Sequence, residues 1–461
     1  MGRARAKRIP AKVVEDEEYQ LTHERSCGID IAKDKADIAV RLPPEREGGR
    51  RRTRTWTVAA TFANITELGT ELLGARVEIV VMEATSDYWR SWFYLLEAMG
   101  LNVRLVNPSD ARQLAGRPKT DVLDCQWLAR LAEMGLLRPS FVPPPAVRAL
   151  RDLTRTRLHL TRDRTREWQR LEKLLEGALI RISSAVGKMA GNQSALRILQ
   201  AIADGERDPA ALAATAHGNV KGGRDGIRAA LEGMMPGEHH IELIRVHLRV
   251  ITMLEQEADR VDDLIAAHID AMEDAWGVTA DGVPSPHPGP DAAVLTAATR
   301  LAEIPGVSPE LAVSIIAETG LDMTRFPAAA HLVAWAGLSP VSRQSGKQNK
   351  KAKKGKGDAC LKGYCSQASL GASKTPTFLG ERYRRLARRI GAPRAQTAVA
   401  RSILVITWHL LADPAARFTD LGPDWHLRKT DRARRTRSHI QQLRALGYDV
   451  TLTPAGADPA A

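Results

Sequence analysis

Four carboxylates in the first third of the chain have the types and the spacing of a divalent-cation site. Asp30 lies in CGIDIAKDKADIAV, Glu83 lies in VEIVVMEATSDYW, and the pair Asp121 and Asp124 lies in KTDVLDCQWLARL. Asp30 and Glu83 each follow a short apolar, β-branched run, which is typical of a buried strand. An acid that ends such a strand is costly to bury unless it is paired or binds a cation. Asp121 and Asp124 stand at i and i+3 of an expected helix, so both side chains can point to one side.

Four acids from two strands and a helix predict a site for one or two hard divalent cations. Mg²⁺ is the expected ion, with Mn²⁺ as its substitute, because carboxylate oxygens are the ligands these ions prefer. Two such ions about 3.5–4 Å apart activate a nucleophile and stabilise the leaving oxygen in phosphodiester chemistry. Each acid alone has a more ordinary interpretation as a cap, a surface charge or a turn residue. The set of four, in this order, indicates catalysis.

The elements that must position these acids follow a recognisable order. The patterns predict two strands over 27–42 that turn at Lys33–Lys35, further strands over 54–61, 77–84 and 102–108, and helices over 64–74, over 88–100 and up to about 137. Three consecutive strands followed by alternating helices and strands resemble the plan of the ribonuclease-H-like α/β fold. That fold keeps its metal site on the first strand, the fourth strand and the last helix, and the four acids fall at those places.

Length and charge limit the class of protein. At 461 residues the chain has room for two or three domains and a sizeable core. Lys and Arg number 67 against 54 Asp and Glu, a formal charge of +13, which favours a polyanionic partner such as nucleic acid. A membrane partner is not expected, because no run of about 18 apolar residues appears and the N-terminus has no apolar core of a signal peptide. We expect a cytoplasmic protein.

The four cysteines do not form a recognisable site. Cys27, Cys125, Cys360 and Cys365 are too few and too scattered for a disulfide framework, and their spacing matches no zinc site. We expect free thiols in a reducing compartment.

Shifts in composition predict six segments. They are a charged, disordered lead-in (1–24), the metal-dependent domain (25–140), a coiled-coil arm with a helical insertion (147–275), a Pro/Gly-rich linker (276–294), a helical domain (295–412) and a basic tail (413–461).

The arm is predicted from two long helical stretches with heptad-like apolar stripes. The first stripe consists of Trp168, Leu171, Leu175 and Ala178, and the second of Ile241, Leu243, Val246, Val250, Met253, Val261 and Leu264. Two such helices with opposite directions predict an antiparallel coiled coil. The first helix is rich in arginine, which is explained equally well by a solvated face with local partners at Asp152, Asp163 and Glu167 or by contact with a nucleic-acid backbone.

A second centre begins at residue 301. LAEIPGVSPELAVSIIAETG resembles a helix-hairpin-helix, in which Pro305, Gly306 and Val307 would form a turn whose backbone N–H groups face a phosphate. Ser308 is the expected N-cap and Pro309 the first helical residue. A basic segment follows, with eight basic residues and one acid between Arg343 and Lys362.

This basic segment is interpreted either as a solubilising loop or as the part that neutralises phosphates beside an acidic metal site. Ser345 lies in it, and on local context alone such a serine is usually a turn residue rather than a nucleophile. The candidate nucleic-acid ligands of the segment are Arg343, Lys347, Lys350, Lys351, Lys353 and Lys354.

Taken together, the motifs GIDIAKDK, VVMEAT, KTDVLD, EIPGV and WAGLSPVSRQSG stand in an order that resembles the DEDD insertion-sequence transposases. These are serine-containing recombinases guided by a bridge RNA and related to Piv-type DNA invertases. The resemblance covers about residues 27–411. It implies a RuvC-like domain whose acids match Asp30, Glu83, Asp121 and Asp124, and a helical transposase domain whose nucleophile matches Ser345.

The resemblance also implies a mechanism and partners. Donor and target DNA would be cut and rejoined through a phosphoserine at an active site composed across subunits, in a dimer or tetramer held by the coiled-coil arm, with a structured guide RNA choosing the target. Two alternatives stay open from the residues alone. One is a RuvC-like Mg²⁺-dependent nuclease that hydrolyses branched DNA without a covalent intermediate, and the other is a non-catalytic nucleic-acid-binding protein with a decayed metal site.

Overall fold

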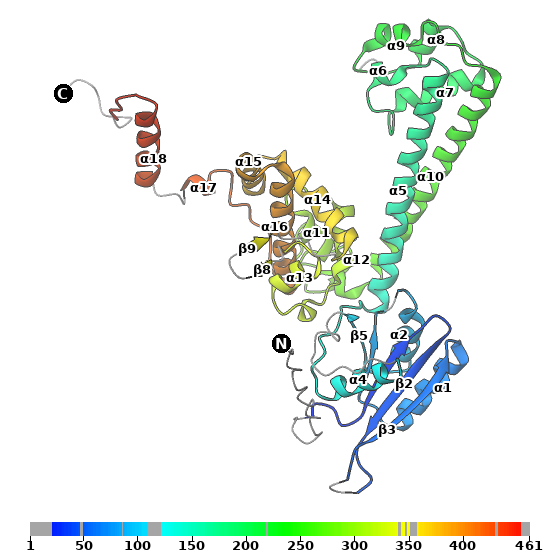
Figure 1. The fold of residues 1–461 in the computed structure, drawn as a ribbon. Coiled ribbons are helices and arrows are strands. Elements are labelled where there is room, and N and C mark those ends of the chain that lie inside the picture. Colours follow the sequence, from blue (N-terminus) through cyan, green and yellow to red (C-terminus); the bar gives the residue numbers. More distant parts are fainter. Residues whose placement is uncertain are drawn as a thin grey trace, which may run out of the picture. The chain divides into compact units, whose positions relative to one another are not determined.

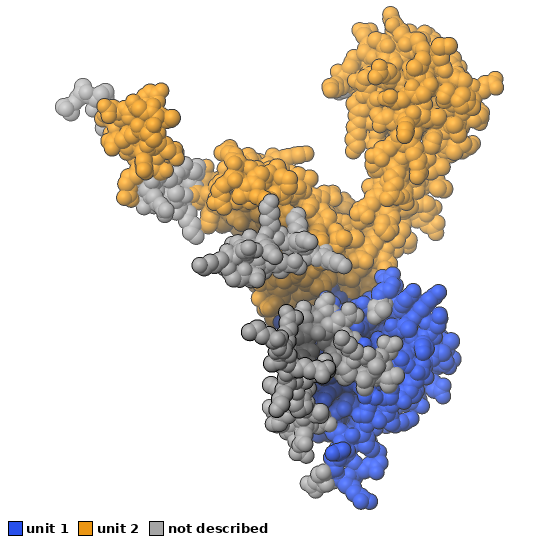
Figure 2. Space-filling view, in the orientation of Figure 1, with its two compact units in different colours: residues 1–142 blue, residues 143–461 orange. Residues whose placement is uncertain are grey.

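The structure is a computed structural model that describes residues 21–46, 49–84, 86–108, 121–217, 220–339, 343–345, 348–350, 357–428 and 432–452. The chain forms two compact units, residues 1–142 and 143–461 (Figure 2). Each unit has its own core and is described by itself.

The first unit is built on a five-stranded mixed sheet. Its strands are β1 (Ser26–Ile31), β2 (Lys35–Leu42), β3 (Arg52–Ala59), β4 (Ile79–Glu83) and β5 (Val103–Val106). The strand order is β3-β2-β1-β4-β5, with β2 antiparallel to both neighbours and β1, β4 and β5 parallel. This order and these directions are those of the ribonuclease-H-like fold, so the expected fold class of this unit is confirmed.

Helices cover both faces of the sheet, which is why the central strands are continuous apolar runs. The helices α1 (Phe62–Gly74) and α2 (Trp89–Ala98) lie on one face, and α4 (Asp121–Glu133) lies on the other. The α1 and α2 side contributes the larger core cluster, which contains Ile29, Met82, Leu68, Trp92 and Leu96. On the α4 side, Ile79 and Val81 of β4 pack against Leu128 and Ala132.

The second unit contains a long helical hairpin, here called the arm. Its helices α5 (Pro145–Gly177) and α10 (Glu238–Asp270) have 33 residues each and run side by side (Figure 1). They are antiparallel, because contacts pair early residues of α5 with late residues of α10: His268 with the carbonyl of Ala146, and Arg157 with Asp262. At the other end Glu167 meets His247.

Four short helices cap the arm at its tip. They are α6 (Ile182–Val186), α7 (Gln193–Asp204), α8 (Pro209–Ala214) and α9 (Gly223–Leu231). Their apolar faces enclose one core with the ends of α5 and α10, and the four residues of the expected first stripe are all buried in it: Trp168, Leu171, Leu175 and Ala178.

The expected second stripe is wrong in part. Leu243, Val246, Met253 and Leu264 are exposed. The face of α10 that is buried contains Ile241, Ile244, Leu248, Ile251, Ala258 and Val261. The exposed residues are spaced by three, seven and eleven positions, which also keeps them on one side of the helix. The helix therefore carries two apolar stripes, and periodicity alone does not decide which one faces α5.

The rest of the second unit is mainly helical. It contains α11 (Ala297–Ala302), α12 (Pro309–Thr319), α13 (Ala329–Trp335), α14 (Ala359–Ser373), α15 (Phe378–Ile390) and α16 (Ala392–Ala412), followed by α17 (Trp425–Arg428) and α18 (Arg432–Ala445). Short elements join them: the 3-10 turns η2 (Glu273–Ala275) and η3 (Met323–Arg325) and the ribbons β6 (Gly277–Val278) with β7 (Pro284–Ser285) and β8 (Arg343–Ser345) with β9 (Gln348–Lys350).

Within the described residues, α16 is the one helix long and apolar enough to pass a composition test for a membrane span. Its apolar side chains, among them Val399, Ile403 and Leu404, are instead buried against α13, α14 and α15. The helix therefore has the environment of a core helix.

Candidate active site

Asp30 and Glu83 occupy neighbouring positions on adjacent parallel strands. The register pairs Ile29 of β1 with Met82 of β4, so the next residue of each strand is one of the two acids. Ile29 and Met82 lie in the core under α1 and α2. Because side chains alternate along a strand, Asp30 and Glu83 project from the opposite face, the one that α4 covers.

Helix α4 lies directly across β1 at this point. A Cβ on Gly28 would fall 2.2 Å from the carbonyl oxygen of Cys125 and 2.5 Å from the amide of Ala129. Two residues earlier in β1, the hydroxyl of Ser26 donates to the carbonyl oxygen of Ala129 at 2.9 Å. The first turn of α4, with Asp124, is therefore directed toward the end of β1 that carries Asp30.

The electrostatics of this face are those of clustered acids. Glu83 is only 7% exposed. Burial, with smaller contributions from the carboxylates of Asp37 and Asp30, raises the pKa of the Cys125 thiol to about 11. Carboxylates brought together at a partly buried site repel one another, and a cation relieves that repulsion. A set of oxygen ligands alone fits a hard divalent ion.

Three of the four expected acids can be placed in detail. The structure brings Asp30, Glu83 and Asp124 to the α4 face of the sheet, and Asp121 begins α4. The side chain of Asp121 lies outside the described residues.

Ser345 ends the short strand β8. Its backbone pairs with Gln348 of β9, and Arg343 pairs with Lys350, so the serine stands beside the turn of a hairpin. Lys347, Lys351, Lys353 and Lys354 lie outside the described residues, as do the side chains of Arg343, Ser345 and Lys350. The acids and the serine belong to different units of the chain.

The turn between α11 and α12 has the expected caps. The hydroxyl of Ser308 accepts from the amide of Leu311 at 3.2 Å, and Pro309 opens the helix. Gly306 has a φ of +88°, and a Cβ there would fall 2.2 Å from the carbonyl oxygen of Ala368 in α14. Close packing on α14 thus explains the glycine, and phosphate contact by Pro305, Gly306 and Val307 stays a prediction.

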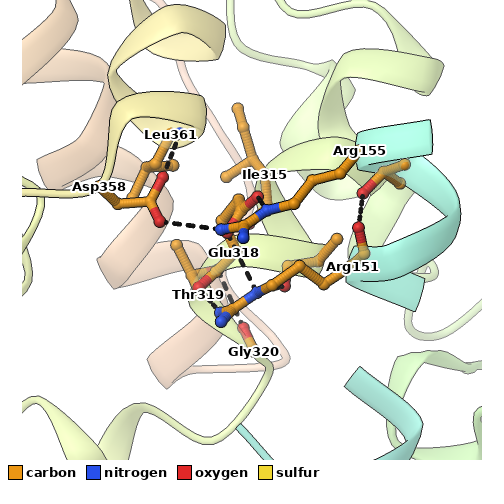
Figure 3. A network of polar contacts seen from close by, with 10 residues as sticks. Arg151, Arg155, Ile315, Glu318, Thr319, Gly320, Asp358 and Leu361 are labelled. Carbon is orange, nitrogen blue, oxygen red and sulfur yellow. Dashed lines mark hydrogen bonds and ion pairs between the residues drawn. The ribbon is translucent and has the colours of Figure 1, made fainter. Parts of the chain in front are cut away.

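A polar network that sequence reasoning missed lies at the base of the arm (Figure 3). Glu318 of α12, Asp358 and Cys360 each place a ligand-type atom within 4.8 Å of the others. Arg155 of α5 binds both carboxylates, and Arg151 binds Glu318. Because these guanidinium groups already neutralise the acids, the cluster is an ion-pair network rather than a metal site.

The arginines of α5 divide between local and distant partners. Arg166 pairs with Asp163 and Arg170 with Glu167, as the spacing suggested. Arg151 and Arg155 instead reach acids more than 160 positions away in the sequence. Their placement one helical turn apart was the available signal, but it does not identify such partners.

Comparisons with known proteins agree with this layout. A family model for transposases of the DEDD IS110 type matches residues 27–180, and a model for the IS116/IS110/IS902 transposase family matches residues 298–384. No curated protein matches the chain.

Two solved structures of Thermus thermophilus RuvC are also similar. One is 16% identical with a TM-score of 0.20 and covers 25% of this chain and 98% of its own. The other, in complex with a Holliday junction substrate, is 17% identical with a TM-score of 0.19 and covers 26% of this chain and 100% of its own. These scores are low, and the fold class rests on the strand order described above. The two family matches, one over the acid-bearing unit and one on both sides of Ser345, show that the chain belongs to the IS110-type family of DEDD transposases.

Proposed function

We propose that this insertion-sequence transposase cuts and rejoins DNA strands through a covalent phosphoserine on Ser345, with Mg²⁺ held by Asp30, Glu83, Asp121 and Asp124. The observation that supports it most is the convergence of Asp30, Glu83 and Asp124 on one face of the sheet. Carboxylate oxygens are the ligands that suit a divalent cation able to bind phosphate oxygens.

The chemistry proposed for Ser345 balances without a further reactant. Its Oγ forms a bond to the scissile phosphorus, one P–O bond of the strand breaks, and the departing oxygen leaves as a DNA hydroxyl. A hydroxyl of another strand then attacks the phosphoserine and releases the serine. A divalent ion, when bound by the four acids, would polarise the scissile phosphate. The number of phosphodiester bonds is conserved, as rejoining requires and hydrolysis does not allow.

The positive charge of the chain would hold the nucleic acids. In this proposal Arg343, Lys347, Lys350, Lys351, Lys353 and Lys354 neutralise phosphates close to Ser345. The turn Pro305–Val307 is a further candidate phosphate contact. A structured guide RNA would choose donor and target DNA by base pairing, so the protein would bind mainly backbone and shape.

We also propose that the arm works as a coiled-coil element that joins two or four copies. The exposed side chains of Leu243, Val246, Met253 and Leu264 support this, because they follow a heptad spacing on the solvent side of α10. A second copy of the same helix is the partner that such a stripe fits. The composite active site would form between copies in the bacterial cytoplasm, near the nucleoid.

A trapping assay tests the mechanism. Protein, RNA transcribed from the flanks of the element, donor and target DNA and Mg²⁺ are mixed, denatured and examined for a protein–DNA adduct. We expect an adduct that is lost in Ser345→Ala and in Asp30→Ala. Ser373→Ala and Asp34→Ala are matched controls, because Ser373 lies at the end of α14 and Asp34 in an exposed turn.

The outcomes separate the alternatives. DNA cleavage that persists in Ser345→Ala without an adduct would show a metal-dependent nuclease that uses water. DNA binding without Mg²⁺-dependent cleavage in the wild-type protein would favour the alternative of a non-catalytic nucleic-acid-binding protein.

A further inference from the structure

The buried carboxylate of Glu318 organises the base of the arm (Figure 3). Its side chain is 0% exposed. Arg155 donates to it twice, from Nε to Oε1 and from Nη2 to Oε2, both at 2.8 Å. Arg151 donates from Nη2 to the Glu318 carbonyl oxygen at 2.7 Å and from Nε to the Ala317 carbonyl oxygen at 3.0 Å. A bidentate arginine–carboxylate pair of this kind fixes orientation as well as charge.

Arg155 also binds Asp358, the N-cap residue of α14. Its Nη2 donates to Oδ2 of Asp358 at 3.1 Å, while Oδ1 of Asp358 accepts from the amide of Leu361 at 2.7 Å. Both oxygens of Asp358 are therefore used, one to cap α14 and one to bind the arm. Hydrogen bonding to Glu318 raises the pKa of Arg155, so this guanidinium stays charged.

Gly357, the residue before Asp358, packs against the backbone at the end of α13. Gly357 has a φ of +44°, and a Cβ on it would fall 2.4 Å from the carbonyl oxygen of Ala336 and 2.5 Å from the amide of Gly337. The backbone that follows α13 and the backbone that precedes α14 thus meet. Residues 338–356, here called the serine loop, begin and end at this neck, and Ser345 lies between its two ends.

We propose that Arg155 is a positioning residue for Ser345: through Asp358 and Glu318 it fastens the neck of the serine loop to α5. The inference rests on the proposed role of Ser345 as nucleophile. The neck lies next to the network, so a movement of α5 is passed to the place where the serine loop starts and ends. The arm and the neck then keep one relative orientation.

A cap alone would not need this arrangement. Asn, Ser or Thr caps a helix about as well as Asp does, and none of them carries the charge that binds Arg155. The second oxygen of Asp358 and the long reach of Arg155 add nothing to the capping of α14. They do add a fixed connection between the arm and the neck.

The first experiment measures the rate of amide hydrogen exchange at the neck in the full chain. The variants are Arg155→Ala, Arg155→Lys and Asp358→Asn, and the matched control is Arg157→Ala, which removes an arginine of α5 that pairs with Asp262 of α10. We expect exchange at residues 357–361 to be about tenfold faster in Arg155→Ala and Asp358→Asn, with α16 unchanged. Arg155→Lys should be intermediate, because lysine cannot make the bidentate pair.

Asp358→Asn keeps the inference falsifiable if Arg155→Ala unfolds the unit by removing the bidentate partner of the buried Glu318 carboxylate. Asparagine keeps the cap and leaves the Arg155–Glu318 pair intact. Neck exchange equal to wild type in this variant would overturn the proposal. Faster exchange throughout α16 as well as the neck would overturn it too, since that result shows a general loss of stability.

The second experiment measures the rate of adduct formation at saturating DNA. We expect Asp358→Asn to lower its rate about tenfold while DNA affinity stays within about twofold, and Arg157→Ala to change neither. An unchanged adduct rate with a loosened neck would overturn the positioning role. If the wild-type protein forms no adduct, the proposed function fails, and the exchange experiment still decides whether Arg155 fastens the neck.

Discussion

Gly28 of β1 and Cys125 of α4 approach so closely that a Cβ on Gly28 would lie 2.2 Å from the Cys125 carbonyl oxygen. No side chain fits between the strand and the helix at this point. The contact determines where the first turn of α4 lies, and with it the distance between Asp124 and Asp30. A glycine two positions before an expected metal ligand thus has a packing role in the site.

Gly28→Ala should therefore displace α4. The added methyl group meets backbone atoms that cannot rotate away, so we expect a loss of about 1–3 kcal/mol in the free energy of unfolding. Urea denaturation measures it. Gly74→Ala is the control, because nothing lies within 4 Å of a Cβ at that helical position. A Gly28→Ala protein as stable as wild type would contradict the close contact.

Glu83→Gln tests the metal site without reference to DNA. The amide has the shape of the carboxylate but not its charge, so the metal-free protein should unfold within about 1 kcal/mol of wild type. Mg²⁺ or Mn²⁺ should raise the melting temperature of the wild-type protein, because ligand binding to the folded state stabilises it. The variant should lose most of that rise.

Glu71→Gln is the matched control for this experiment, since Glu71 is exposed on α1. It should keep the full metal-dependent rise. An equal rise in Glu83→Gln and wild type would show that Glu83 is not a ligand.

Sequence patterns predicted local features well and long-range ones poorly. The succession of strands along the first unit followed from its apolar runs, because the burial of a strand shows in consecutive residues, and Asp30 and Glu83 lie near the ends of two of these strands. The order of the strands within the sheet was predicted only from the resemblance to the ribonuclease-H-like fold. The buried face of α10 was assigned wrongly, because two stripes on one helix satisfy the same spacing. The pair Arg155–Glu318 could not be foreseen, since it joins residues whose proximity depends on the packing of α5 on α12.

The exposed stripe of α10 leads to a prediction about assembly. Met253→Lys with Val246→Lys places two charges in the proposed contact between copies, and desolvating them would cost several kcal/mol. We expect the wild-type protein to be a dimer or tetramer and the variant a monomer at the same concentration, as measured by sedimentation equilibrium. Their far-ultraviolet circular dichroism should be alike, because both side chains lie outside the core of the arm.

A charge placed elsewhere on the same helix is the control for assembly. Thr252→Lys changes an exposed residue next to Met253 that is not part of the stripe. It should leave the oligomer intact. If both variants assemble like wild type, the stripe is not the contact.

The arm should lose stability in acid through Glu167. Its Oε1 lies 2.6 Å from Nδ1 of His247, and Arg170 donates to Oε2 at 2.7 Å. Burial raises the pKa of Glu167, but the hydrogen bonds from His247 and Arg170 outweigh burial and lower the pKa below its ordinary 4.5. A carboxyl whose pKa is lower in the folded than in the unfolded state stabilises the fold above the unfolded value, and this contribution is lost as the pH falls through the folded value.

Glu167→Gln should therefore be less stable than wild type near pH 7, by about 1–3 kcal/mol for a charged hydrogen bond in a mostly buried place. The difference should shrink as the pH falls below about 4.5, where protonation removes the charge in the wild-type protein as well. Thermal unfolding from pH 7 down to about pH 2 measures this convergence, with Glu176→Gln, an exposed acid on the same helix, as control. A difference that stays constant across this range would show that the charge of Glu167 does not stabilise the arm.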